Sequence, residues 1–195
     1  MSESTMRPES EKDIIAIGNL CQLVGSCLHN FSRVEESLAA LYGIAAQMPS
    51  IEAAFKTHDE IREFQYRINA TDAVVRHWAS TLDDDVARQS LLTEWNTLHR
   101  QIKEDSQDRN KLAHFRLSPH DNDDGTTTWY VCPYFQIYSH LAHFKASGEK
   151  LKIPDGVRKF DVGSLEAKMA KFERTSKRID GYINRLLELG ARLPG

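Results

Sequence analysis

The chain has 195 residues, of which 41% are hydrophobic, and this length and composition suit a single domain with a substantial core. Its formal net charge of -3 excludes a global positive field that would attract nucleic acid, so any RNA or DNA contact must use a local basic patch. The three cysteines, Cys21, Cys27 and Cys132, are an odd set without metal-ligand spacing, which suits reduced thiols in a cytoplasmic protein.

The start of the chain is polar and carries no early apolar run of the kind found in signal peptides. The longest apolar stretches fall short of the roughly 20 residues that a membrane span needs. We therefore expect a disordered tail over residues 1–10, no membrane association, and one helical domain over residues 11–193.

The first expected helix begins after Ser10 and Asp13, which together form an N-terminal cap with an acid in the first turn. Apolar residues then recur every three or four positions, which predicts one buried face of a long helix. They are Ile14, Ile17, Cys21, Val24, Leu28, Phe31, Val34, Leu38, Leu41 and Ala45. Gly25 and Ser26 mark the place where such a helix would kink, and Pro49 ends it.

Two more helices are expected before residue 115. One runs from about Thr57 to Ser80, with apolar residues at helical spacing. The other opens at Asp83–Asp85, where acidic side chains suit the helix N-terminus. Its apolar positions continue to Ile102, and the segment then becomes polar before it reaches Arg109.

The pattern changes after Phe115, where the turn residues Asp121–Gly125 are flanked by β-branched and aromatic residues. This pattern predicts a β-hairpin at about residues 115–140. A loop should follow, and a last helix should begin near Asp161 or Ser164 and end at Gly190. The expected fold is therefore all-α, an up-and-down helical bundle of about four long helices with a small β-hairpin inserted before the last.

The segment "RNKLAHF" ends the third expected helix and places an arginine, an amide and a histidine within about one and a half turns. Asn110 and His114 are four residues apart and share a helix face, while the long Arg109 side chain can reach the same phosphate-sized space. A simpler interpretation is a charged helix end, with basic residues favouring the helix dipole and an Asp105–Arg109 ion pair. An Arg-x4-His match alone is expected about 0.6 times by chance in such a chain.

The longer pattern Arg109-Asn110-x-x-Ala113-His114 resembles the R-N-x-x-A-H motif of ribonucleases of the HEPN superfamily, which are all-α bundles. The order of elements is similar too: "FSRVEESLAALYGIA" on an early helix, the motif at the end of a later one, and "FDVGSLEAKMAKFERTSKRIDGYINRLLEL" as the closing helix. The hairpin and the long first helix depart from a minimal domain of that kind. The resemblance implies a metal-independent endoribonuclease with Arg109, Asn110 and His114 as catalytic residues.

The residue types suit that chemistry. A histidine can accept or donate a proton near neutral pH, and an arginine fork can bind two phosphate oxygens of a charged transition state. Asparagine can orient the histidine or bind the phosphate. One histidine cannot easily act on both sides of one phosphorus, so we expect a two-fold homodimer that brings two motifs together, as the resemblance also implies. The basic residues near the motif are candidate RNA contacts: Lys111, Arg116, Arg100 and Lys103.

The resemblance further implies the toxic effector of a toxin–antitoxin or phage-defence system, with an antitoxin protein as a partner. The alternatives are a non-catalytic HEPN-like module that binds a nucleotide, RNA or a protein, and a helical interaction protein whose motif is only a charged cap. No cofactor or metal is expected, because His140 and His143 have helical spacing but lack a third ligand. The aromatic residues of the hairpin could stack on unpaired bases or form cross-strand pairs: Trp129, Tyr130, Tyr134 and Tyr138.

Overall fold

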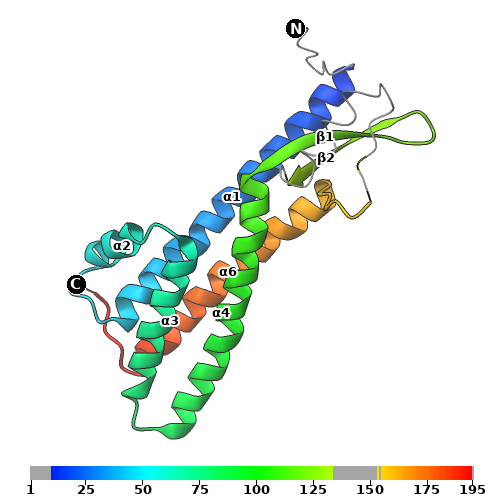
Figure 1. Cartoon of the computed structure of the whole chain (residues 1–195). Coiled ribbons are helices and arrows are strands. Elements are labelled where there is room, and N and C mark those ends of the chain that lie inside the picture. The colour runs from blue at the N-terminus through cyan, green and yellow to red at the C-terminus, as the bar shows by residue number, and fades with distance from the viewer. Residues whose placement is uncertain (1–9, 134–152, 154, 195) are drawn as a thin grey trace. The chain divides into compact units, whose positions relative to one another are not determined.

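The structure, a computed structural model, describes residues 10–133, 153 and 155–194. These residues form five helices and one two-stranded hairpin, which precedes the last helix (Figure 1). The predicted all-α class with a small β-hairpin is therefore confirmed. The tail expected over residues 1–10 lies outside the described residues, apart from its last residue.

The first helix, α1, spans Glu11–Ala45 and confirms the long helix predicted from the apolar rhythm. The Ser10 hydroxyl caps it by accepting a hydrogen bond from the Asp13 backbone N–H at 3.2 Å. The helix continues without a break through Gly25, where a kink was expected. Its buried positions recur every three or four residues, and they include Leu20, Val24, Cys27, Phe31, Val34, Leu38 and Leu41.

By length and composition α1 could also cross a membrane. An 18-residue window within it has a mean hydropathy of 1.3, and 22% of that window is buried. The core helix of a soluble bundle passes the same test, so the expected absence of a membrane span stays a prediction.

The helix expected from Thr57 to Ser80 is instead two helices, α2 (Ile51–Glu60) and α3 (Phe64–Ser80). Ser50 starts α2 early, because its hydroxyl accepts a hydrogen bond from the Ala53 backbone N–H at 3.1 Å. The break follows from Arg67, whose guanidinium binds the carbonyls of Ile61 at 2.7 Å and Asp59 at 3.1 Å. These bonds satisfy carbonyls at the end of α2, and no glycine or proline marks the place.

The helix α4 spans Asp85–Ala113 and begins in the acidic stretch, as predicted. The Asp84 carboxylate caps it by accepting hydrogen bonds from the backbone N–H groups of Val86 at 2.8 Å and Ala87 at 3.1 Å. The helix ends one residue before His114.

The hairpin consists of β1 (Phe115–Asp121) and β2 (Thr127–Pro133), paired antiparallel from Phe115↔Pro133 to Asp121↔Thr127. Gly125 in the connecting turn has φ 82°, a left-handed conformation that glycine adopts without strain. The predicted hairpin is confirmed over these residues, and its expected continuation to residue 140 lies outside the described part of the chain.

The last helix, α6, spans Val162–Glu188 and begins where the sequence predicts. Asp161 and Ser164 cap it reciprocally: the Asp161 carboxylate accepts from the Ser164 backbone N–H, and the Ser164 hydroxyl accepts from the Asp161 N–H, both at 2.8 Å. Gly190 follows with φ 102° and closes the helix end, also as predicted.

The chain divides into two compact units. The first unit contains residues 1–28 and 109–169, and the second contains residues 29–108 and 170–195. In the first unit, the buried Cys27 thiol donates a hydrogen bond to the Leu165 carbonyl at 3.3 Å, which joins α1 to α6.

The second unit is a helical bundle built around aromatic contacts. Phe31 of α1 lies edge-on to Phe64 of α3 at 5.2 Å and to Phe172 of α6 at 5.3 Å between ring centroids. Trp95 of α4 lies 5.5 Å from Tyr182 of α6, and its indole N–H donates to Asp72 of α3 at 2.7 Å. Each of the four helices is thereby packed against two others.

Candidate functional site

The motif lies at the junction between α4 and the hairpin. Arg109 and Asn110 belong to the last turns of α4, and His114 is the first residue after it. The His114 backbone N–H donates to the Asn110 carbonyl at 3.2 Å, so the helical hydrogen bonding extends to the histidine. Phe115 then begins β1, and a change from helix to strand therefore fixes the end of the motif.

The motif side chains lie off the buried face of α4. Asn110 and His114 are exposed and Arg109 is half-buried, whereas Leu112 and Asp108 are buried. The His114 side chain is thus open to solvent, as a residue that acts on RNA must be. In the described part of the chain, the cavities of about 720 Å³ and 490 Å³ are lined by none of the motif residues.

One side-chain contact within the motif joins two neighbouring residues. The Arg109 guanidinium donates to the Asn110 side-chain oxygen at 3.2 Å, so the two residues restrain each other. The Asp105 carboxylate, which was expected to pair with Arg109, is fully buried, and the ion pair with Arg109 stays a prediction. This carboxylate contacts the side chains of Gln101 at 2.9 Å, Thr175 at 2.6 Å and Lys171 at 2.7 Å.

The four basic candidates are divided between the two units. Lys111 in the last turn of α4 and Arg116 in β1 belong to the same unit as the motif, and both are half-buried. Arg100 is exposed and Lys103 is half-buried on the part of α4 that belongs to the second unit. The structure therefore brings Lys111 and Arg116 into one compact unit with the motif.

Among the residues that the structure describes, no group of three or more His, Cys, Asp or Glu side chains could hold a metal ion. The candidate pair His140 and His143 lies outside them, as do Tyr134 and Tyr138.

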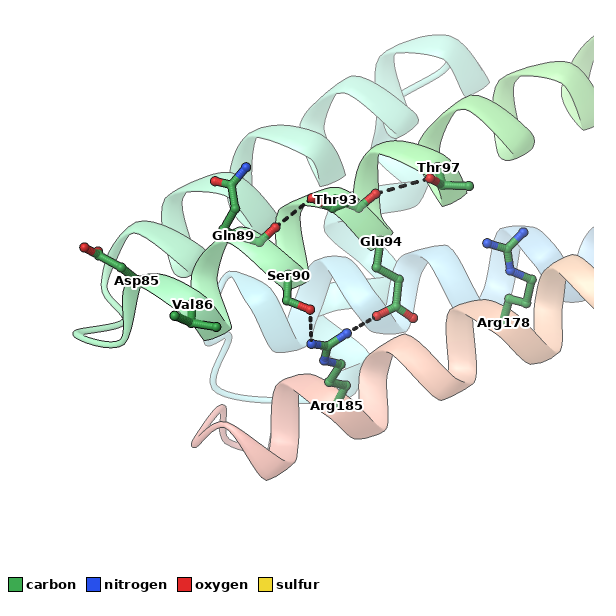
Figure 2. A pocket seen from close by; sticks show the side chains of 9 residues that line it. All are labelled: Asp85, Val86, Gln89, Ser90, Thr93, Glu94, Thr97, Arg178 and Arg185. Atoms are coloured by element: carbon green, nitrogen blue, oxygen red, sulfur yellow. Dashed lines mark hydrogen bonds and ion pairs between the residues drawn. The ribbon is translucent and has the colours of Figure 1, made fainter.

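An open cavity of about 720 Å³ lies in the second unit between α4 and α6 (Figure 2). Sequence reasoning missed it, although Ser90, Thr93 and Thr97 recur along α4 at helical spacing. The full lining is Asp85, Val86, Gln89, Ser90, Thr93, Glu94, Thr97, Arg178 and Arg185.

The polar groups of this cavity mostly serve the fold. Arg185 of α6 forms an ion pair with Glu94 of α4 and donates to the Ser90 hydroxyl at 2.8 Å (Figure 2). The hydroxyls of Thr93 and Thr97 donate to backbone carbonyls one turn earlier in α4. The Arg185 contacts join α4 to α6, and the threonine contacts lie within α4.

Comparison of the chain with protein-family models, curated proteins and solved structures gives no match. The HEPN resemblance therefore depends on the motif and on the order of the elements.

Proposed function

We propose that the chain is a metal-independent endoribonuclease of HEPN type. The observation that carries the proposal is the arrangement of Arg109, Asn110 and His114 on the exposed end of α4, with the arginine and the amide in contact.

The reaction needs no group beyond these side-chain types and the RNA itself. The 2'-hydroxyl loses its proton to a base, its oxygen bonds to the adjacent phosphorus, and the bond from phosphorus to the 5'-oxygen breaks. A proton passes to that 5'-oxygen, which leaves a 2',3'-cyclic phosphate and a 5'-hydroxyl. Histidine is suited to the proton transfers, and the arginine fork is suited to the charge that builds on the phosphate oxygens.

A base and an acid are needed on opposite sides of the phosphorus, and each chain has one motif. We therefore propose a two-fold homodimer in which each chain supplies one His114 to a composite site. Lys111 and Arg116 would bind neighbouring phosphates, and Arg100 and Lys103 stay expected RNA contacts of the second unit. A cytoplasmic toxin or phage-defence effector, held inactive by an antitoxin protein, is the setting that we propose for this activity.

The test is cleavage of single-stranded RNA by the purified full-length chain. We expect cleavage to continue in EDTA and to stop at any position where the attacking sugar is 2'-deoxy. We expect each upstream product to carry a 2',3'-cyclic phosphate, detected by mass spectrometry. RNA binding without cleavage of any RNA would overturn the proposal in favour of a non-catalytic binding module.

A further inference from the structure

A cavity of about 490 Å³ lies in the first unit, which also contains the motif. Three segments that are distant in the sequence form it: the first turns of α1, the start of β2 and the first residues of α6. Its lining includes Lys12, Asp13, Asn19, Trp129 and Asp161. This volume falls in the range of small-molecule sites, which is roughly 300–1,000 Å³.

The cavity contains a tryptophan held in a fixed orientation. The Trp129 indole N–H donates to the Asp13 carboxylate at 2.9 Å, which ties the ring of β2 to α1. The indole is half-buried, so part of its surface stays accessible, and Ala16, Leu20 and Val162 add apolar lining. A restrained aromatic ring beside apolar side chains is suited to stacking with a planar ligand.

The polar lining falls into two classes. The Asp13 and Asp161 carboxylates are already engaged as helix caps, with Ser10 and Ser164 respectively, and their hydrogen bonds lower the pKa of both groups. The Asn19 amide and the Lys12 ammonium have no hydrogen-bond or ion-pair partner among the described residues. The cavity therefore offers an amide that both donates and accepts, and one cation.

We propose that this cavity binds a base of the RNA substrate, stacked on Trp129, with Asn19 bonded to the base edge and Lys12 paired with a phosphate. A nucleotide matches all three groups, because it joins a planar ring, an edge with both donors and acceptors, and an anion. This inference rests on the proposed ribonuclease function. It identifies the cavity as the site where the enzyme would distinguish one unpaired base from another.

Binding can be measured separately from cleavage with an RNA oligonucleotide whose sugars are all 2'-O-methyl and therefore cannot attack. Fluorescence anisotropy of this labelled probe should show Trp129→Ala weakening binding by about tenfold or more, as loss of a stacking ring does. Asn19→Ala should reduce the difference in affinity between probes of different base. The matched controls are Gln22→Ala, one turn along α1 and outside the cavity, and Tyr66→Ala, which removes an aromatic that is 59% exposed on α3. Neither control should change affinity.

The two proposals fail in different ways. If the chain cleaves RNA while Trp129→Ala and Asn19→Ala bind and cleave like the controls, the base site is wrong and the ribonuclease stands. If both variants weaken binding of the probe but the chain cleaves no RNA, the base site stands and the ribonuclease is wrong. Circular dichroism checks that each variant is folded. If Trp129→Ala does not fold, the result for Asn19→Ala alone decides whether the base site is correct.

Discussion

Lys171 of α6 forms an ion pair with the buried carboxylate of Asp105 on α4, with 2.7 Å between the two charged groups. Gln101 and Thr175 donate to the same carboxylate, so both of its oxygens are bonded. A charge removed from water in this way is tolerated only while its partners are present.

We predict that Lys171→Met lowers the free energy of unfolding by about 3 kcal/mol, because it leaves the Asp105 carboxylate buried without its cation. Urea unfolding followed by circular dichroism measures the loss. The control is Lys177→Met, which breaks an exposed pair with Glu173 on the same helix and should cost less than about 1 kcal/mol. Equal losses in the two variants would contradict the role assigned to Asp105.

A second prediction concerns the motif. His114→Ala should lower the cleavage rate by about 10²–10⁴-fold, the usual loss when a proton-transfer group is removed. Arg109→Ala should cost on the order of 10²–10³-fold through loss of charge stabilisation, and Arg109→Lys should recover little of it because a point charge cannot replace a bidentate fork. Asn110→Ala should have the smallest effect.

Single-turnover cleavage measures these rates, and two exposed residues of the same types serve as controls. His29→Ala on α1 and Arg62→Ala between α2 and α3 should retain full activity. A loss in the controls as large as in the motif variants would show that the effect is not specific to the motif.

A third prediction follows from the composite site. Mixing wild-type chain with an equal amount of His114→Ala, followed by exchange of subunits, leaves roughly one quarter of the pairs with both histidines. At the same total concentration of chain, the mixture should have roughly one quarter of the activity of pure wild type. Sites that act independently would leave roughly one half. Light scattering at micromolar concentration should show a dimer, and a monomer that cleaves RNA would contradict the composite site.

A fourth prediction concerns His58 in α2, which is fully buried. Neither of its ring nitrogens has a hydrogen-bond partner among the described residues. Burial, with a contribution from the charge of Arg67, lowers the pKa of His58 from 6.5 to about 4. Between these values the unfolded chain binds a proton that the folded chain does not, so stability should decrease as the pH falls from 6.5 to 4.

The size of this effect should be on the order of 2 kcal/mol, since each pKa unit corresponds to about 1.4 kcal/mol and partial solvation of the charged form reduces the total. Urea unfolding at pH 7 and pH 4.5 measures it. In His58→Leu the difference between the two pH values should shrink by that amount, whereas His77→Leu on the exposed face of α3 should leave it unchanged.

A fifth prediction concerns the close approach of α1 and α2. A Cβ atom added at Gly43 would lie 2.4 Å from the Ala54 Cβ, so Gly43→Ala must separate the two helices. We expect a loss of about 1–3 kcal/mol in the free energy of unfolding. Gly25→Ala in the same helix meets nothing within 4 Å and should instead stabilise the chain by about 0.5–1 kcal/mol.

The sequence predicts those parts of the fold that local patterns determine. The apolar rhythm gives α1, the acidic stretch gives the start of α4, and the Asp161–Ser164 pair gives the start of α6. The break between α2 and α3 was missed because it depends on a side chain from the following helix, that of Arg67.

The difference between local patterns and contacts between distant segments also explains which parts of the candidate sites the sequence predicts. The motif is contiguous, so its place at a helix end was predictable. The contact of Asp105 with Lys171 was not predicted, because spacing within one helix says nothing about a side chain on another. Base stacking on Trp129 was one alternative that the sequence offered, but the cavity beside it was not predicted, since its lining comes from three segments that only the folded chain brings together.

The three thiols differ in their exposure, which has a consequence for chemical reactivity. Cys21 is exposed on α1, while Cys27 and Cys132 are buried, and burial raises the pKa of each to about 11. A thiol reacts as its thiolate, so a maleimide at neutral pH should modify one position in each chain. The natural protein thus accepts a spin label at Cys21 without any substitution, and the distance between two labels would report how two copies are arranged.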